Sequence, residues 1–240
     1  MRSRLNLILT VALLATPAVR AQEPAGTDVA ADKAFSPAAQ AVVAEWRAEV
    51  APLEAHFAAI RPDLPVAANL AERVAVEQGM REALPPFSRL PLPEAERGAA
   101  SAAIWSRLNA VDAANTAYVK SVIPADGWFR NSRDGKDTTR AAWLIVQHSP
   151  DQAFMREVLA RMEPLARAGE VDGSDFALLY DRTEMYAGRP QYYGSQYTCD
   201  GGRWVPFPSR DPAGVEARRR ALGMSILAEN AARLNAGGGC

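Results

Sequence analysis

The chain has 240 residues, of which 48% are hydrophobic and 23% are charged, and its formal net charge is -1. This composition predicts one globular domain of ordinary solubility. The basic residues do not outnumber the acidic ones, and the arginines are spread along helical segments rather than gathered in one run. The sequence therefore indicates no nucleic-acid partner.

The first residues are typical of a secretory signal peptide. Arg2 and Arg4 precede an apolar run over residues 5–19, and Ala21 completes a site of the kind that a signal peptidase cleaves. An uncleaved membrane anchor would need about 20 apolar residues, and this run is shorter. We therefore expect a signal peptide over residues 1–21, a periplasmic or secreted protein, and no transmembrane segment in the mature chain.

Residues 22–35 are small and polar and predict a flexible leader. The domain itself is expected over residues 36–235, and a flexible tail over residues 236–240. Export to an oxidising environment allows a disulfide between Cys199 and Cys240 without requiring one. Whether these cysteines pair stays open at this point.

Apolar residues recur at helical spacing through most of the domain. Ser36 as N-cap, followed by Pro37, marks the start of the first helix. Helices are expected over about residues 36–60, 67–84, 94–122, 137–148, 150–168, 174–187 and 211–234. The polar residues 130–136 are expected to form a loop.

One segment has the character of β-structure. Gln191–Cys199 and Arg203–Phe207 carry aromatic and β-branched residues, and Asp200–Gly202 supplies turn residues between them. The expected fold is therefore mainly α, a single-domain helical array with one short β-hairpin in its C-terminal half.

The end of the apolar helix TTRAAWLIVQHS is the first candidate site. Gln147 and His148 are two hydrogen-bonding side chains that end a buried helix, and Arg140 and Trp143 share a face with Gln147. The histidine either interacts with the helix C-terminus, which favours a cationic imidazole, or serves as an acid or base near neutral pH. Both interpretations remain open.

The helix in SDFALLYDRTEMYAG places Asp181 on an apolar stripe. A buried carboxylate needs a partner, which Arg182, Arg140, His148 or a tyrosine hydroxyl could supply. Asp181 either forms a structural ion pair at a helix end or orients His148 for catalysis. In the hairpin, Gln196 either presents an amide to a ligand or belongs to an aromatic flap that packs on the helices.

The sequence predicts neither a metal site nor a cofactor. The other histidine, His56, is far upstream, and no His-x-x-x-His spacing or cysteine cluster is present. Glu72, Glu77 and Asp112 could join His148 around an ion, but no pattern brings them together. A nucleophile elbow and a phosphate-binding glycine loop are also absent.

Three stretches carry a resemblance to a known family: GWFRNSRDGKDTTRAAWLIVQHSPDQAFMREVL, DFALLYDRTEMYAGRPQYYGSQY and DPAGVEARRRALGM. Over about residues 112–227 the chain resembles a bacterial family classified only as a domain of unknown function, DUF6624. Its members show a Gly-Trp loop, a Trp-Leu-x-x-Gln-His helix and a Gln-x-Tyr-Gly-Thr-Gln motif, in which Ser195 here replaces the threonine. The resemblance implies these site residues: Trp128, Gln147, His148, Asp181, Arg182, Gln191, Tyr193, Gly194 and Gln196. It implies no particular reaction.

Three functions are consistent with these residues. The first is an exported protein that binds a small polar ligand or peptide between the Gln147–His148 helix end, the Asp181–Arg182 helix and the hairpin. The second is a metal-independent hydrolase or transferase in which His148 is the general base and Asp181 orients it. The third is an envelope-associated interaction module without a catalytic site.

Overall fold

The computed structural model describes residues 36–236, which divide into two compact units. We call residues 36–171 the N-terminal unit and residues 172–236 the C-terminal unit, and each is described by itself. The expected signal peptide with its cleavage after Ala21, the expected leader over residues 22–35 and Cys240 lie outside the described residues.

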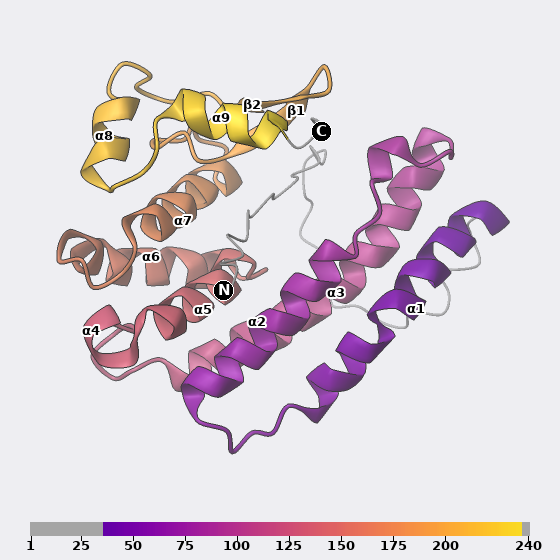
Figure 1. Ribbon diagram of the computed structural model, residues 1–240, viewed down its shortest axis with the longest axis horizontal. Helices are drawn as coiled ribbons and strands as arrows, with labels where there is room; N and C mark the ends of the chain where they lie inside the picture. Colours follow the sequence, from indigo (N-terminus) through magenta and orange to yellow (C-terminus); the bar gives the residue numbers. More distant parts are fainter. Residues whose placement is uncertain (1–35, 237–240) are drawn as a thin grey trace, which may run out of the picture. The chain divides into compact units, whose positions relative to one another are not determined.

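The expectation of a mainly α fold is confirmed (Figure 1). The N-terminal unit contains α1 (Pro37–Ala59), α2 (Val66–Glu82), the 3-10 helix η2 (Phe87–Arg89), α3 (Glu94–Val122), α4 (Asn131–Asp134), α5 (Lys136–Gln147) and α6 (Gln152–Arg167). The predicted start of α1 is confirmed, since Oγ of Ser36 accepts a hydrogen bond of 3.2 Å from the backbone N–H of Ala39, and Pro37 follows.

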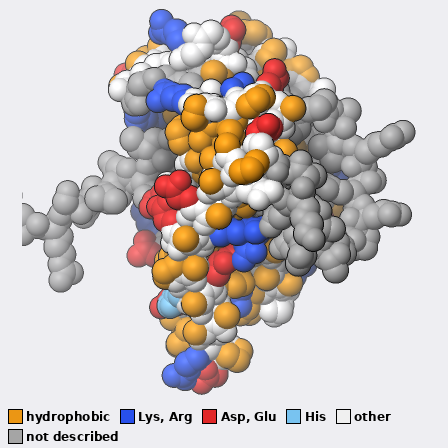
Figure 2. Space-filling model, turned by 90° about the vertical axis from the view of Figure 1, so that its right-hand side faces the viewer, with side chains coloured by type: hydrophobic (Ala, Val, Ile, Leu, Met, Phe, Trp, Pro, Cys, Tyr) orange, Lys and Arg blue, Asp and Glu red, His pale blue; other side chains and the backbone are white. Residues whose placement is uncertain are grey.

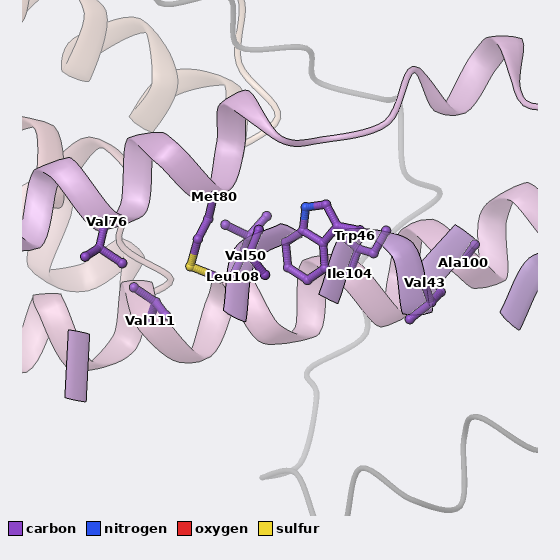
Figure 3. Close-up of a cluster of buried hydrophobic side chains, with 9 residues drawn as sticks. All are labelled: Val43, Trp46, Val50, Val76, Met80, Ala100, Ile104, Leu108 and Val111. Atoms are coloured by element: carbon purple, nitrogen blue, oxygen red, sulfur yellow. The ribbon is translucent and has the colours of Figure 1, made fainter. Parts of the chain in front are cut away.

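The long helices α1, α2 and α3 pack against one another around a hydrophobic core (Figure 1). The buried core side chains, shown in Figure 3, are Val43, Trp46 and Val50 from α1, Val76 and Met80 from α2, and Ala100, Ile104, Leu108 and Val111 from α3. Because burial of apolar surface is the main stabilising term, this core fixes α2 and α3 side by side. Polar side chains on those two helices are thereby held in constant positions.

Helix α5 packs against both α2 and α3, and α6 packs against α5. Nine of the twelve residues of α5 are buried, and they include the whole apolar run over residues 141–146. The prediction of a loop over residues 130–136 is wrong in one detail, because this segment contains the short helix α4. The backbone N–H of Arg130 donates to Oδ2 of Asp134 over 2.8 Å, and this side-chain contact closes the short helical turn.

The C-terminal unit contains α7 (Gly173–Tyr186), β1 (Tyr197–Asp200), β2 (Arg203–Pro206), α8 (Val215–Ala221) and α9 (Leu227–Ala236). The two strands form an antiparallel hairpin with Asp200 opposite Arg203. Between them, Gly201 and Gly202 have φ angles of 54° and 77°, as a two-residue type I′ loop requires. The predicted hairpin is confirmed, but its first strand begins at Tyr197 rather than Gln191.

The prediction of a single last helix over residues 211–234 is wrong, because the chain forms two separate helices there, α8 and α9. Gly223 has a φ of +68°, and the backbone N–H of Met224 donates to the carbonyl oxygen of Arg219 over 2.9 Å. This is the hydrogen bond of a Schellman C-cap, which ends a helix. The helical periodicity of the sequence continues through this cap, so periodicity alone could not reveal it.

No helix within residues 36–236 is long and apolar enough to cross a membrane. On the face drawn in Figure 2, the described acidic and basic side chains are interspersed with hydrophobic ones.

Candidate functional site

His148 lies at the C-terminal end of α5, and its side chain is only 3% exposed. Its Nδ1 atom is 2.9 Å from Oε1 of Glu77, a fully buried carboxylate on α2. The two residues are 71 positions apart in the sequence. They meet because α5 packs directly against α2.

Glu77 also binds α3. Nδ2 of Asn115 donates to Oε2 of Glu77 over 3.1 Å, and Oδ1 of the same amide accepts a hydrogen bond of 3.2 Å from Arg73. Burial raises the pKa of Glu77 to about 7, against the opposing effects of Arg81 and Asn115. A carboxyl group with that pKa can take up or release a proton near neutral pH.

Asp112 on α3 is the second buried carboxylate. Nη2 of Arg81 lies 2.6 Å from Oδ2 of Asp112, whose side chain is 3% exposed. Burial raises the pKa of Asp112 to about 6, Arg81 acts to lower it, and the nearby Glu77 acts to raise it further. The other oxygen, Oδ1, is buried and has no hydrogen-bond partner among the described residues.

These side chains form what we call the buried polar cluster: Glu77, Arg81, Asp112, Asn115 and His148. Sequence reasoning named Glu77 and Asp112 only as conceivable ligands of an ion and did not name Arg81 or Asn115. A signal was present, because Glu77 and Arg81 are four residues apart and Asp112 and Asn115 are three apart, so each pair shares a helix face. Within residues 36–236, no three His, Cys, Asp or Glu side chains are placed to hold a metal ion together.

Asp181, the other predicted catalytic residue, is fully buried in α7. Its carboxylate accepts hydrogen bonds from the backbone N–H groups of Tyr192 (2.7 Å), Tyr193 (2.9 Å) and Ser195 (2.9 Å). The sequence predicted a side chain as the partner of this carboxylate. The structure shows that its partners are backbone amides. Asp181 holds the segment Gln191–Gln196 in a turn, which explains why this segment is not a strand.

The two glutamines of that segment bind the protein's own backbone. Oε1 of Gln191 accepts from the N–H of Gln196 over 2.9 Å, and Nε2 of Gln191 donates to the carbonyl oxygen of Phe207 over 2.7 Å. The side chain of Gln196 donates to the carbonyl oxygen of Leu178 over 3.3 Å and accepts from Arg182 over 3.4 Å. Both glutamines are buried and stabilise the turn.

Tyr193 and Gly194 complete the same turn. The Tyr193 ring lies against the rings of Tyr180 and Tyr192, with centroids 5.5 and 5.1 Å apart. Burial, followed by the neighbouring tyrosines, raises the pKa of Tyr193 to about 12. Gly194 has a φ of +67°, and a Cβ atom there would lie 2.8 Å from Cδ1 of Leu227. Only glycine fits this position without strain.

A family model described as a family of unknown function, DUF6624, matches residues 79–239. The chain belongs to the DUF6624 family. Comparison with curated proteins and with solved structures gave no match. The family match begins just after Glu77 and includes Arg81, Asp112 and His148.

The DUF6624 motifs have different structural roles in this chain. The Trp-Leu-x-x-Gln-His helix contributes His148 to the buried polar cluster and places the fully buried Gln147 beside it. The Gln-x-Tyr-Gly-Ser-Gln motif forms the turn around Asp181. The structure thus brings together Asp181, Arg182, Gln191, Tyr193 and Gln196 within the C-terminal unit, while Gln147 and His148 belong to the N-terminal unit.

The remaining predicted residues also lie in the N-terminal unit. Trp128, from the Gly-Trp loop of the DUF6624 pattern, is 1% exposed and packs edge-on against Phe129, with ring centroids 5.5 Å apart. Arg140 is exposed, and its guanidinium lies 5.4 Å from the centroid of the Trp143 ring. Trp128 therefore contributes to packing, and Arg140 to a cation–π contact at the surface.

An open hollow in the N-terminal unit lies apart from the predicted residues. It is formed by the end of α3, the segment over residues 123–127 and α6, with Lys120, Phe154 and Arg161 among its lining side chains. Neither the cluster nor any predicted site residue lines it.

Proposed function

We propose that this DUF6624 protein is exported and binds a small polar ligand at the buried polar cluster of its N-terminal unit. The observation that supports this proposal is the burial of two carboxylates, Glu77 and Asp112, of which only Asp112 is in direct contact with the guanidinium of Arg81. Burying ionisable groups reduces stability unless they are fully paired. Groups that are buried with strongly raised pKa values are concentrated at functional sites.

The chemistry of the cluster favours a ligand that donates a hydrogen bond. Asp112 offers a buried acceptor oxygen, whereas Arg81 and Asn115 already donate to Asp112 and Glu77. A small molecule or peptide end with an amino or amide group would satisfy this oxygen. Helices α2, α3 and α5 hold the side chains in place before the ligand arrives, which lowers the entropic cost of binding.

Thermal unfolding of the purified protein with a panel of amino acids, dipeptides, polyamines and sugars tests this function. A ligand that binds the folded state raises Tm, by an amount equivalent to about 2.7 kcal/mol at a hundredfold excess over Kd. His148→Ala should lose the rise and remain folded. His56→Ala is the matched control, because His56 is 51% exposed on α1 and lies outside the cluster. Retention of the full rise by His148→Ala would contradict binding at the cluster.

Acid–base catalysis is the second candidate, and the contact between Nδ1 of His148 and Oε1 of Glu77 favours it. A carboxylate on one ring nitrogen fixes the orientation and tautomer of a histidine that exchanges protons through the other. The protein would then be a metal-independent hydrolase or transferase with Glu77 as the orienting residue. Hydrolysis of chromogenic esters, amides and phosphoesters should be lost in His148→Ala and kept in His56→Ala. Equal rates in the two variants would exclude this role.

A further inference from the structure

Four ionisable side chains meet in the buried polar cluster: Glu77 and Arg81 from α2, Asp112 from α3 and His148 from α5. Arg81 and Asp112 form an ion pair at 2.6 Å that is neutral as a whole above about pH 6, where Asp112 is ionised. Glu77 is left facing His148, at 2.9 Å. Among the described residues, Arg73 is a further nearby cation, and it reaches Glu77 through the amide of Asn115.

The charge of the Glu77–His148 pair depends on a single proton. With a neutral imidazole and an ionised carboxylate, the pair carries one negative charge, although its side chains are 0% and 3% exposed. A buried net charge is strongly disfavoured. One added proton gives the pair zero net charge wherever it resides. On Nδ1 it produces an imidazolium beside a carboxylate, and on Oε1 it produces a neutral imidazole beside a carboxylic acid.

We propose that the Glu77–His148 pair is a buried proton-binding site that takes up one proton from water as the pH falls through the neutral range. No covalent bond between heavy atoms forms or breaks, and the charge of the Glu77–His148 pair changes from -1 to zero. The pKa of Glu77, raised to about 7 by burial, agrees with this assignment. Control of ligand affinity by this proton rests on the proposed function, whereas proton uptake itself is tested without ligand.

A second, exposed histidine–glutamate pair serves as a control for the Glu77–His148 pair. It has two histidines, and each contacts a glutamate of α2. Nε2 of His56 lies 2.5 Å from Oε2 of Glu72, but these side chains are 51% and 44% exposed. The two pairs share the same chemistry and differ in burial, so a comparison isolates the effect of burial.

Urea unfolding of the ligand-free protein between about pH 5.5 and about pH 8.5 measures the difference in bound protons between the folded and unfolded states. In the unfolded chain the imidazole of His148 takes up a proton below about pH 6.5, so proton uptake by the folded pair and by the unfolded chain nearly offset each other in the wild type at the low end of this range. Glu77→Gln removes the proton site of the folded state alone, so its slope should differ from the wild-type slope by about one proton, up to about tenfold per pH unit in the folding equilibrium constant, and Glu72→Gln should keep the wild-type slope. An unchanged slope in Glu77→Gln would overturn the proposal, even if ligand binding at the cluster were demonstrated.

A second variant tests the proposal if Glu77→Gln does not fold. Asp112→Asn removes the carboxylate that pairs with Arg81, so the positive charge of Arg81 would act on Glu77 alone. The pH at which the Glu77–His148 pair takes up its proton should therefore be lower in this variant. The imidazole NMR signals of His148 should change over the same pH range as the unfolding slope. A transition that stays in place in Asp112→Asn, or His148 signals that stay constant across it, would each contradict the proton site.

Discussion

Nδ1 of His148 and Oε1 of Glu77 lie 2.9 Å apart in the interior of the N-terminal unit. The pKa of Glu77 is about 7, above its ordinary value of 4.5, so the folded protein holds this proton more tightly than the unfolded chain. The resulting stabilisation is fully present below about pH 4.5 and is lost as the pH rises through about 7, a change of at most about 3 kcal/mol. We expect this contribution of Glu77 to decline over that range, measured in urea as the difference in free energy of unfolding between the wild type and Glu77→Gln.

Removal of the partner of Asp112 should destabilise the protein in a pH-dependent way. Arg81→Met leaves a buried carboxylate without its cation, which should reduce the free energy of unfolding by about 3 kcal/mol at pH 8. The pKa of Asp112 is about 6, so at lower pH the carboxyl takes up a proton and the loss becomes smaller. Denaturant titrations at the two pH values measure the difference.

The exposed ion pair of Arg61 and Asp63 is the matched control for that variant. These side chains are 70% and 67% exposed, so solvent screens their attraction. Arg61→Met should leave the unfolding midpoint nearly unchanged at both pH values. Equal losses in the free energy of unfolding in Arg81→Met and Arg61→Met would show that the buried ion pair stabilises the protein no more than the exposed one.

Asp181→Asn should weaken the turn of the C-terminal unit. An amide has one acceptor oxygen, and its NH₂ group would point at backbone N–H groups that the carboxylate now accepts. We expect a loss of about 2–4 kcal/mol in the free energy of unfolding. Asp200→Asn, at the exposed end of β1, should have almost no effect on the same measurement. A small loss in Asp181→Asn would mean that the turn is held mainly by other contacts.

Gly194→Ala separates backbone strain from crowding. The φ of +67° alone should reduce stability by about 1 kcal/mol, and the contact of 2.8 Å between the new Cβ atom and Leu227 should add to that. Gly188→Ala is the control, because Gly188 has a φ of +68° with no atom within 4 Å of the new Cβ. A larger drop in Tm for Gly194→Ala than for Gly188→Ala is expected, and equal drops would exclude the steric contribution.

Several elements could be predicted because their causes are local. Ser36 and Pro37 start α1 through a side-chain cap and a preset φ angle, and Gly201 and Gly202 form the loop of the hairpin. The break at Gly223 was missed because one glycine within a helical pattern does not reveal whether it forms a cap. The segment Gln191–Gln196 was misread as a strand because aromatic residues also suit a turn that is held by a buried carboxylate.

The mainly helical fold, the hairpin in the C-terminal half and the resemblance to the DUF6624 family could all be inferred from the sequence alone. Periodicity, capping residues and motifs operate over a few consecutive positions, so they can be read without a fold. The contact of His148 with Glu77 and the binding of Asp181 to the backbone of a turn became visible only in the folded chain. Those contacts depend on which face of each helix packs against its neighbours, and that choice is made by burial of the whole core rather than by any local pattern.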